Sequence, residues 1–329
     1  MRRALAIACV FALSSNPAFA YLKFGVTIGG RQVTLKWAQT PVRYFVSNTS
    51  VPGVSTDGFL AAVGRAFNSW QAVSTASISY QLGGITNALP ERDDGLSTLG
   101  FLNRPELDRV LASTSYLIDA STGALIESDI FFNSAFPWSV APAGEPGRFD
   151  VESIALHEIG HLNGLGHSAL GETELREGGG RRVISSEAIM FPIAFAAGSI
   201  AGRTLKADDT AGISDLYPAA GFAQASGTVS GRVTKDGVGV FGAHVVAFDP
   251  ATGAMVGNFS LNGQGQFSIG GLSPGPRVLR VEPIDDADVE SFFDPSQVDL
   301  DFRVLFFDRV VVVPRGGDSG QVELRVVRK

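Results

Sequence analysis

The chain has 329 residues, of which 45% are hydrophobic and 18% charged, so it can bury a sizeable core and is not expected to be disordered as a whole. Its formal net charge is −7, and no basic cluster stands out along it. An acidic chain of this kind is a poor candidate for nucleic acid or anionic lipid, so we expect neither as a partner. The length favours two domains over one.

The first twenty residues have the order of a secretory signal. Two arginines precede an apolar run, and small residues stand where a signal peptidase would cut, before Tyr21. The apolar run is shorter than the ~18 residues that a membrane span needs, and no later stretch reaches that length. We therefore predict export, to the periplasm or outside the cell, with no membrane span. The alternative for this stretch is a buried N-terminal helix.

The next elements are a strand, a helix and a hairpin. The run VRYFVS is rich in β-formers, and residues 55–73 predict a helix with Ser55 or Thr56 as its N-cap. Apolar residues recur in this helix at helical spacing, which indicates a face that packs in the core. Residues 112–133 predict a hairpin around a turn at 119–123.

Two further helices are expected in the first half. A loop rich in proline and glycine leads into a helix that begins at Asp150, and LKADDTAGISDLYP predicts another that ends at Pro218. From Ser226 the pattern changes, because apolar and polar residues then alternate between turns without helical periodicity. The predicted divisions are a signal at 1–20, a first domain at 21–218, a linker at 219–226 and an all-β sandwich at 227–329, with strands at 303–313 and 321–327.

Three of the four histidines lie in HEIGHLNGLGHS, residues 157–168. Residues four apart on a helix point the same way, so His157 and His161 can bind one face of a Zn²⁺ ion. Glu158 follows the first ligand, where it can take a proton from an activated water and pass it to a leaving amine.

The rest of this stretch completes the predicted site. Gly164 can end the helix in the left-handed conformation, after which His167 can return as the third ligand. The fourth position stays open for water or substrate, as in catalytic zinc sites. We therefore predict one catalytic zinc ion.

The spacing HExxHxxGxxH resembles the zinc signature of the metzincins, and its surroundings resemble the matrixin branch. Ser168 follows the third histidine, and EAIMFP places Met190 where the family has its Met-turn, a hydrophobic floor beneath the zinc. LKADDTAGISDLYP is similar to the closing helix of the family, whose paired acids, here Asp208 and Asp209, anchor the Met-turn and the N-terminal segment. The resemblance covers roughly residues 37–218.

The resemblance implies an α+β metzincin catalytic domain, with a twisted mixed sheet, an active-site helix and a C-terminal helix. It implies that His157, His161 and His167 are zinc ligands, that Glu158 is the general base, and that the substrate is a protein or peptide. It also implies a sheet edge along which an extended peptide pairs, and an apolar pocket for the residue after the scissile bond. The residues assigned to that edge are Ile130, Phe131 and Phe132, and those assigned to the pocket wall are Phe191, Pro192 and Ile193.

The chain departs from the animal-type family in several ways. Its one cysteine, Cys9, lies in the predicted signal, so no cysteine switch can hold the enzyme latent, and it is either active as made or controlled by a separate protein inhibitor. His244 is the only histidine left for a structural zinc, and we expect it on a strand without a catalytic role. Calcium stays open, because aspartates and carbonyls suffice to bind it. The candidates for calcium are Asp93, Asp94 and Asp129.

Two charged stretches lie outside the zinc signature and the Met-turn. Residues 169–187 are glycine-rich, and we expect a mobile loop near the cleft, either recognising substrate or forming a plain surface insertion. Residues 285–295 are acidic, and a solvated loop is favoured over a calcium site. The C-terminal module, with its turn in GQFSIGGLSPGPRVLRVEP, resembles carboxypeptidase-regulatory or transthyretin-like sandwiches, which act as spacers, stabilisers or adhesive appendages.

These features together predict a secreted zinc-dependent endopeptidase. Two alternatives stay open. One is a non-catalytic binding or adhesion protein in which the β-sandwich is the functional part, although an intact Glu158 argues against it. The other is a zinc amidase that acts on cell-wall peptides, which shares the chemistry and differs in its substrate.

Overall fold

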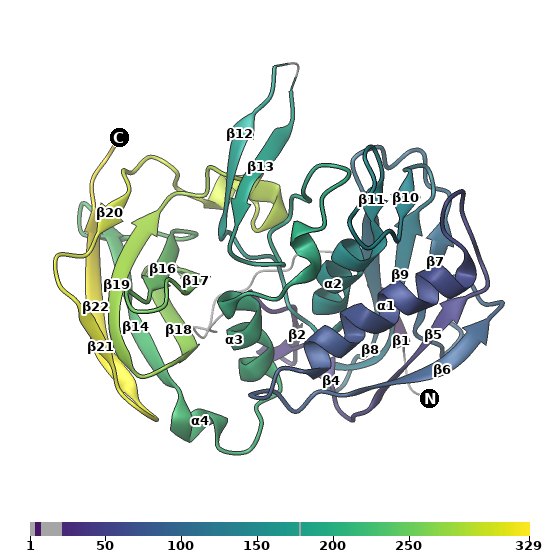
Figure 1. The fold of residues 1–329 in the computed structure, drawn as a ribbon. Helices are drawn as coiled ribbons and strands as arrows, with labels where there is room; N and C mark the ends of the chain where they lie inside the picture. Colours follow the sequence, from purple (N-terminus) through teal and green to yellow (C-terminus); the bar gives the residue numbers. More distant parts are fainter. Residues whose placement is uncertain (1–3, 8–21, 178) are drawn as a thin grey trace.

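A seven-stranded mixed sheet organises the first half of the chain in the computed structural model, which describes residues 4–7, 22–177 and 179–329 (Figure 1). Neighbouring strands are parallel except where β8 pairs with β9 and with β1. Across the sheet the order is β1 (Ala4–Ile7), β8 (Ala112–Asp119), β9 (Ala124–Asn133), β7 (Thr98–Leu102), β5 (Val42–Ser47) and β6 (Tyr80–Thr86), and β4 (Lys36–Trp37) also pairs with β9.

The predicted hairpin at 112–133 is confirmed as β8 and β9. Most of the predicted signal peptide lies outside the described residues. Within the described residues, no helix is long and apolar enough to cross a membrane.

Two helices cover one face of this sheet. α1 (Thr56–Gln71) begins after Ser55, whose side chain accepts a hydrogen bond from the N–H of Gly58, as the N-cap prediction requires. Its apolar stripe is buried against the sheet and against α2 (Val151–Leu162), so the predicted core face is confirmed. Trp70 of α1 also donates a hydrogen bond from Nε1 to the carbonyl of Leu156, which fixes the two helices against each other.

α2 is capped at both ends as the sequence predicts. Asp150 is its N-cap, and its side chain accepts from the N–H of Ser153. After Leu162 the chain turns at Gly164, which has φ +100°. A Cβ at this position would lie 2.3 Å from the carbonyl oxygen of Leu35, so both the conformation and the close backbone approach require glycine.

Several short elements complete the first half. α3 (Ala207–Leu216) confirms the helix predicted before Pro218. The others are the 3₁₀ helix η1 (Ala201–Arg203), the hairpin of β2 (Gly25–Ile28) and β3 (Arg31–Thr34), and the pair of β10 (Trp138–Ser139) and β11 (Phe149–Asp150).

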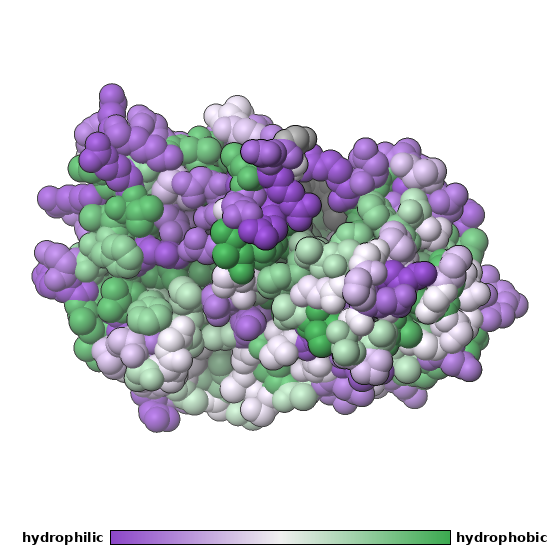
Figure 2. Space-filling view, turned by 45° about the horizontal axis from the view of Figure 1, so that its top comes forward, coloured by the Kyte–Doolittle hydropathy of each residue, from purple (hydrophilic) through white to green (hydrophobic). Residues whose placement is uncertain are grey.

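The insertion at 169–187 contains a β-hairpin and is therefore not an irregular loop, while its mobility stays a prediction. Its strands are β12 (Gly171–Leu175) and β13 (Arg181–Ser186), and Figure 1 shows them projecting from the body. Glu174 lies opposite Arg182 across the hairpin and forms an ion pair with it, while Gly179 and Gly180 adopt positive φ between the strands. Hydrophilic side chains gather over this projection in Figure 2.

The last hundred residues form two further sheets that share an apolar core. The strand predicted at 321–327 is present in β22, which lies parallel to β14, whereas the one predicted at 303–313 is divided into two short strands, β20 and β21. One sheet contains β15 (Val238–Gly239), β14 (Gly227–Lys235), β18 (Gln266–Leu272) and β22 (Asp318–Val326); the other contains β17 (Met255–Phe259), β16 (His244–Phe248), β19 (Gly275–Glu282), β20 (Leu305–Phe306) and β21 (Val311–Val313). A short helix, α4 (Phe222–Ala225), lies in the predicted linker.

The acidic stretch at 285–295 is not a solvated loop, so that prediction was also wrong. It contains the 3₁₀ helix η2 (Val289–Ser291) and leads into η3 (Pro295–Gln297). Phe292 and Phe293 are buried in one apolar cluster with Phe191 and Phe259, so the segment packs between the two halves of the chain. The free energy gained by burying two adjacent phenylalanine side chains is large enough to hold the segment in place despite the acidic residues around them.

Asp150 gives a test of how α2 is held. Its carboxylate caps α2 and also accepts two hydrogen bonds from Arg203, at 2.9 and 2.5 Å, while both side chains are mostly buried. We expect Asp150→Ala to lower the free energy of unfolding by about 3 kcal/mol, because it removes an N-cap and leaves a buried guanidinium poorly paired. Urea unfolding measures this change.

The matched control is Asp57→Ala in the first turn of α1, where the side chain is exposed. We expect its free energy of unfolding to stay within about 0.5 kcal/mol of the parent. Equal losses for the two substitutions would contradict the assignment.

Candidate metal centre

The histidines of the signature stretch converge on one point. His157 and His161 lie one turn apart on α2, and His167 returns beside them after the turn at Gly164. One ring nitrogen of each histidine lies within 4.8 Å of those of the others, and the Nε2 atoms of His161 and His167 are 3.2 Å apart. The three side chains predicted from spacing are therefore brought together.

Each of these imidazoles has its Nδ1 atom against a backbone carbonyl oxygen. The acceptors are Ile189 for His157 at 2.7 Å, Leu165 for His161 at 2.8 Å and Ser291 for His167 at 2.8 Å. A carbonyl can only accept, so each ring donates from Nδ1 and leaves the Nε2 lone pair free. This is the arrangement in which histidines bind metals, with the second nitrogen held by an outer partner.

Burial keeps the three rings neutral. It lowers the pKa of His157 to about 3, with a smaller contribution from the charge of His167. Burial also lowers the pKa of His161 well below its usual value and lowers the pKa of His167. Neutral imidazole is the form that binds a metal, so the site is ready to accept a cation at ordinary pH.

Glu158 lies beside this cluster and is 6% exposed. Burial raises the pKa of its carboxyl to about 7, although a 2.6 Å hydrogen bond from the Thr114 hydroxyl opposes the shift. A carboxyl with a pKa near neutrality can both accept and return a proton. Thr114 comes from β8, so the sheet as well as the helix positions this side chain.

Met190 lies beneath the histidine helix. A Cβ added to Gly160 would be 2.2 Å from the Met190 sulfur, so the thioether packs directly on the backbone of α2 between the two histidine turns. Its main chain is fixed as well, because its carbonyl accepts from the N–H of Ser168 at 2.9 Å. The geometry agrees with a hydrophobic floor and explains why α2 needs a glycine here.

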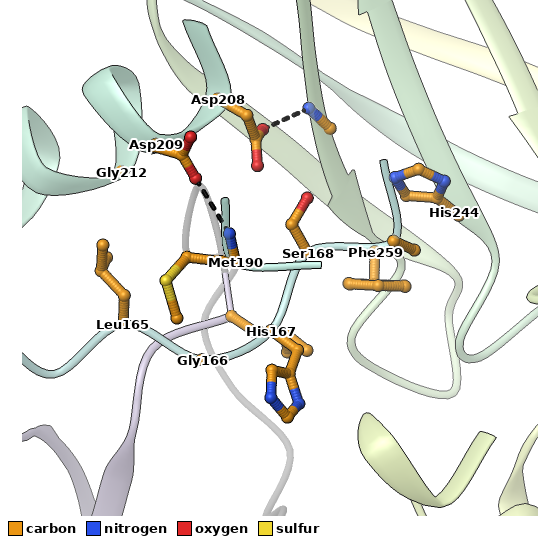
Figure 3. Close-up of a pocket in the computed structure, with 13 residues that line it drawn as sticks. Leu165, Gly166, His167, Ser168, Met190, Asp208, Asp209, Gly212, His244 and Phe259 are labelled. Carbon is orange, nitrogen blue, oxygen red and sulfur yellow. Dashed lines mark hydrogen bonds between the residues drawn. The ribbon is translucent and has the colours of Figure 1, made fainter. Parts of the chain in front are cut away.

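Asp209 anchors the turn that carries Met190 (Figure 3). Its carboxylate accepts from the N–H groups of Ile189, Met190 and Lys206 at distances from 2.8 to 3.2 Å. Burial raises the pKa of Asp209 to about 6, and these hydrogen bonds oppose that shift. The predicted link from the paired acids to the Met-turn is therefore present.

Among the described residues, the partners of Asp208 lie in the C-terminal part and in the ligand loop after α2 rather than in an N-terminal segment. The Asp208 carboxylate accepts from the N–H of Gly257 in β17, at 2.8 Å, and also bonds the side chain of Ser168 (Figure 3). The contact with Gly257 follows from the fold, because the C-terminal sheets lie against α3, the helix that carries Asp208. A small cavity of about 20 Å³ is lined by Ser168, Asp208 and His244. His244 lies on β16 and bonds Glu282 at 3.0 Å.

A cleft of about 660 Å³ opens over the histidines. One side is the beginning of β8, with Ala112, Ser113 and Thr114. The lining also includes Phe191, Pro192 and Ile193, the residues that the resemblance assigns to the pocket wall. The hairpin and the 285–295 segment border the same cleft through a few polar side chains. These are Arg181, Ser186, Asp288 and Ser291.

The predicted substrate edge at Ile130, Phe131 and Phe132 was wrong. These residues lie in β9, which pairs with β8 on one side and β7 on the other, and all three are buried. A run of consecutive buried apolar residues is typical of a strand inside a sheet rather than at its edge. The strand that borders the cleft is β8, and among the described residues β1 pairs with it at 116–119.

Several residues around the site were not predicted. The Tyr116 hydroxyl donates to the carbonyl of His161 at 2.9 Å, and the Phe24 ring lies 5.4 Å from the His161 ring. The contacts of Thr114 and Ser291 were also missed. Thr114 and Tyr116 are two residues apart on β8, so their side chains lie on the same face of the sheet. This spacing predicts that both contact α2 once β8 is known to pack against that helix. Ser291 contributes only its backbone carbonyl, which leaves no mark in a sequence.

The calcium candidates are not brought together as a metal group. Among the described residues, the three histidines form the one cluster whose donor atoms could surround an ion. Asp129 is buried and accepts from the N–H groups of Thr98 and Arg92, at 2.7 and 3.1 Å, while Asp93 and Asp94 are exposed. Asp129 thus organises the loop before β7.

Comparison with known proteins agrees with this geometry. Residues 36–175 match the family model described as matrixin, peptidase family M10, and this stretch contains the three histidines and Glu158. Metalloendoproteinase 1-MMP of Arabidopsis thaliana is 28% identical over 200 residues, which are 55% of this chain and 44% of that protein. Metalloendoproteinase 1 of Glycine max is 29% identical over 179 residues, which are 49% and 46%.

The chain therefore matches less than half the length of these curated relatives. Among solved structures, the Bacillus anthracis TIE protein aligns with 32% of this chain and 17% of its own, at 17% identity and a TM-score of 0.20. That likeness is too low to support an argument.

Asp208 predicts a pH dependence of stability. Burial and the charge of Asp209 raise the pKa of its carboxyl from 3.8 to about 7, so the folded protein binds this proton more tightly than the unfolded chain. For this group the free energy of unfolding therefore falls as pH rises from about 4 to about 7. Asp208→Asn keeps an oxygen for the Gly257 N–H and removes the titration. We expect the variant to gain stability relative to the parent across that window, measured by thermal unfolding at a series of pH values.

Asp57→Asn is the control, because that side chain is exposed, and its stability curve should run parallel to the parent's. A difference between parent and Asp208→Asn that stays constant from pH 4.5 to 7.5 would show that Asp208 is already ionised in the folded protein.

Proposed function

We propose that this chain, whose residues 36–175 match the matrixin family model, is a secreted zinc-dependent endopeptidase. The observation that carries the proposal is the set of three Nδ1–H···O=C hydrogen bonds, which aims three neutral Nε2 lone pairs at one point. Export rests on the signal-like order of residues 1–20 in the sequence.

The donor set suits zinc. Three imidazole nitrogens with an open fourth position are typical of catalytic zinc, and His157, His161 and His167 would bind it. A bound zinc ion supplies a Lewis acid that polarises water and the scissile carbonyl. Calcium is a poor match for this centre because it prefers oxygen ligands.

Glu158 is the proposed proton carrier. Its carboxylate takes a proton from the attacking water and delivers it to the amide nitrogen of the leaving group. Thr114 holds Oε2 of Glu158 at 2.6 Å, so the carboxylate has a fixed direction before substrate binds. Burial of the pair excludes bulk water that would compete for the proton.

The substrate is proposed to be an extended peptide that lies along the start of β8. Ala112, Ser113 and Thr114, at the start of this strand, border the cleft, and strand addition would place the peptide beside them. On the opposite side, Phe191, Pro192 and Ile193 offer an apolar wall to the side chain after the scissile bond.

The C-terminal part is proposed to be a β-sandwich of the carboxypeptidase-regulatory or transthyretin-like kind, over 227–329. Two sheets with a common buried core support this. Its contacts with the metal centre argue against a loosely tethered spacer, since Asp208 and His167 both bond to its backbone.

Glu158→Gln tests the mechanism in the chain from residue 21 to 329. The glutamine side chain cannot carry the proton, so we expect kcat/KM on casein or a mixed peptide library to fall by about 10²- to 10⁴-fold. The three histidines are unchanged, so zinc content should remain at one per chain. Metal analysis of the same samples measures the zinc content.

Glu152→Gln is the matched control, because it removes another mostly buried carboxylate from the same helix, one that pairs with Arg65. Its kcat/KM should stay within a few-fold of the parent. Cleavage that survives Glu158→Gln would show that the base is misassigned. Zinc binding without cleavage of proteins would favour a binding role, and cleavage of cell-wall peptides alone would favour the amidase.

A further inference from the structure

We propose that the segment 284–293 is a positioning element of the metal centre and acts on His167 through the Ser291 carbonyl and the Phe292 ring. The inference rests on the proposed function, because it assumes that His167 is a metal ligand. It assigns the C-terminal part of the chain a place in the site itself.

His167 differs from the other two ligands in its support. His157 and His161 are fixed by α2, and their Nδ1 atoms bond to carbonyls of Ile189 and Leu165, in the same half of the chain. His167 lies on the loop after the helix, and its Nδ1 bonds to the carbonyl of Ser291, 124 residues further on. The direction of this ring therefore depends on the C-terminal part.

Phe292 supports the same ring from the side. It is fully buried, its ring centroid lies 6.2 Å from that of His167, and the two planes meet at 76°. Behind it, Phe292 packs against Phe259 of β17 at 5.4 Å. The apolar cluster also contains Phe191, which directly follows Met190, so the ligand loop and the Met-turn share this support.

The segment is itself tied to the first half of the chain. Asp286 accepts from the N–H and the hydroxyl of Thr173 in β12, at 2.8 and 2.7 Å. Arg181 of β13 donates to the carbonyl of Asp285 at 2.8 Å and lies 3.6 Å from Asp288. The hairpin therefore holds the segment over the cleft, and the carbonyl of Ser291 is presented to His167 by a network rather than by a free loop.

Outer partners of this kind affect how tightly a metal is bound. A ligand that loses its orienting partner must be ordered by the ion itself, and such losses typically weaken metal binding 10- to 100-fold. Phe292 is in this sense a positioning residue, because it contacts a ligand and not the reacting atoms.

Phe292→Ala in the full chain tests the inference. We expect zinc to bind 10- to 100-fold more weakly, measured by competition with a chromophoric chelator. The absorption spectrum of the cobalt-loaded protein should also change, because the ligand field depends on the direction of the His167 ring. Both readouts are independent of proteolysis.

Phe293→Ala is the matched control. Phe293 is equally buried, but its ring packs against Phe241 and Phe259, at 5.1 and 5.0 Å. It should lose similar thermal stability while zinc affinity stays within about threefold of the parent. Phe292→Leu serves as a milder change if the alanine variant does not fold.

The inference would be overturned if Phe292→Ala and Phe293→Ala had equal thermal stability and also bound zinc with equal affinity. Failure of the proposed function looks different, because there the parent binds zinc and cleaves no peptide whatever residue stands at 292.

Discussion

Three hydrogen bonds from histidine Nδ1 to backbone carbonyls are the constraint on which the rest of this molecule depends. An imidazole that is free to rotate offers either nitrogen in many directions, whereas a ring with one nitrogen fixed offers the other in a single direction. The three acceptors come from the turn after α2, from the residue before Met190 and from the segment at 284–293. The fold has to bring these separate segments to one helix.

Buried carboxylates secure one of these segments and the neighbouring strand β17. Asp209 binds the backbone of the turn that carries Met190, and Asp208 binds the backbone of β17. Two neighbouring buried carboxylates destabilise the folded protein unless they are hydrogen-bonded. The N–H groups that bond to Asp208 and Asp209 therefore offset the cost of burying them. Gly160 and Gly164 meet the steric side of the same requirement, because larger residues would displace Met190 or Leu35.

Local features of the site could be predicted from the sequence because they depend on spacing along one helix and one turn. Both N-caps and the turn at Gly164 belong to this class and are confirmed, and His157, Glu158 and His161 lie on the predicted helix. Features that depend on long-range pairing were not predictable in this way. The resemblance places an edge at residues 130–132, whereas β9 is an interior strand, and an apolar run by itself does not say which strands flank it. The segment at 285–295 was taken for a solvated loop because its charges obscured Phe292 and Phe293, whose burial requires a partner surface from the other half of the chain.

X-ray absorption at the zinc edge on the zinc-loaded full chain tests the central claim most directly. The account predicts one zinc ion per chain with three imidazole nitrogens at about 2.0–2.1 Å and a fourth, exchangeable oxygen ligand. A fourth ligand from the protein, or a first shell of oxygens without imidazole, would contradict it.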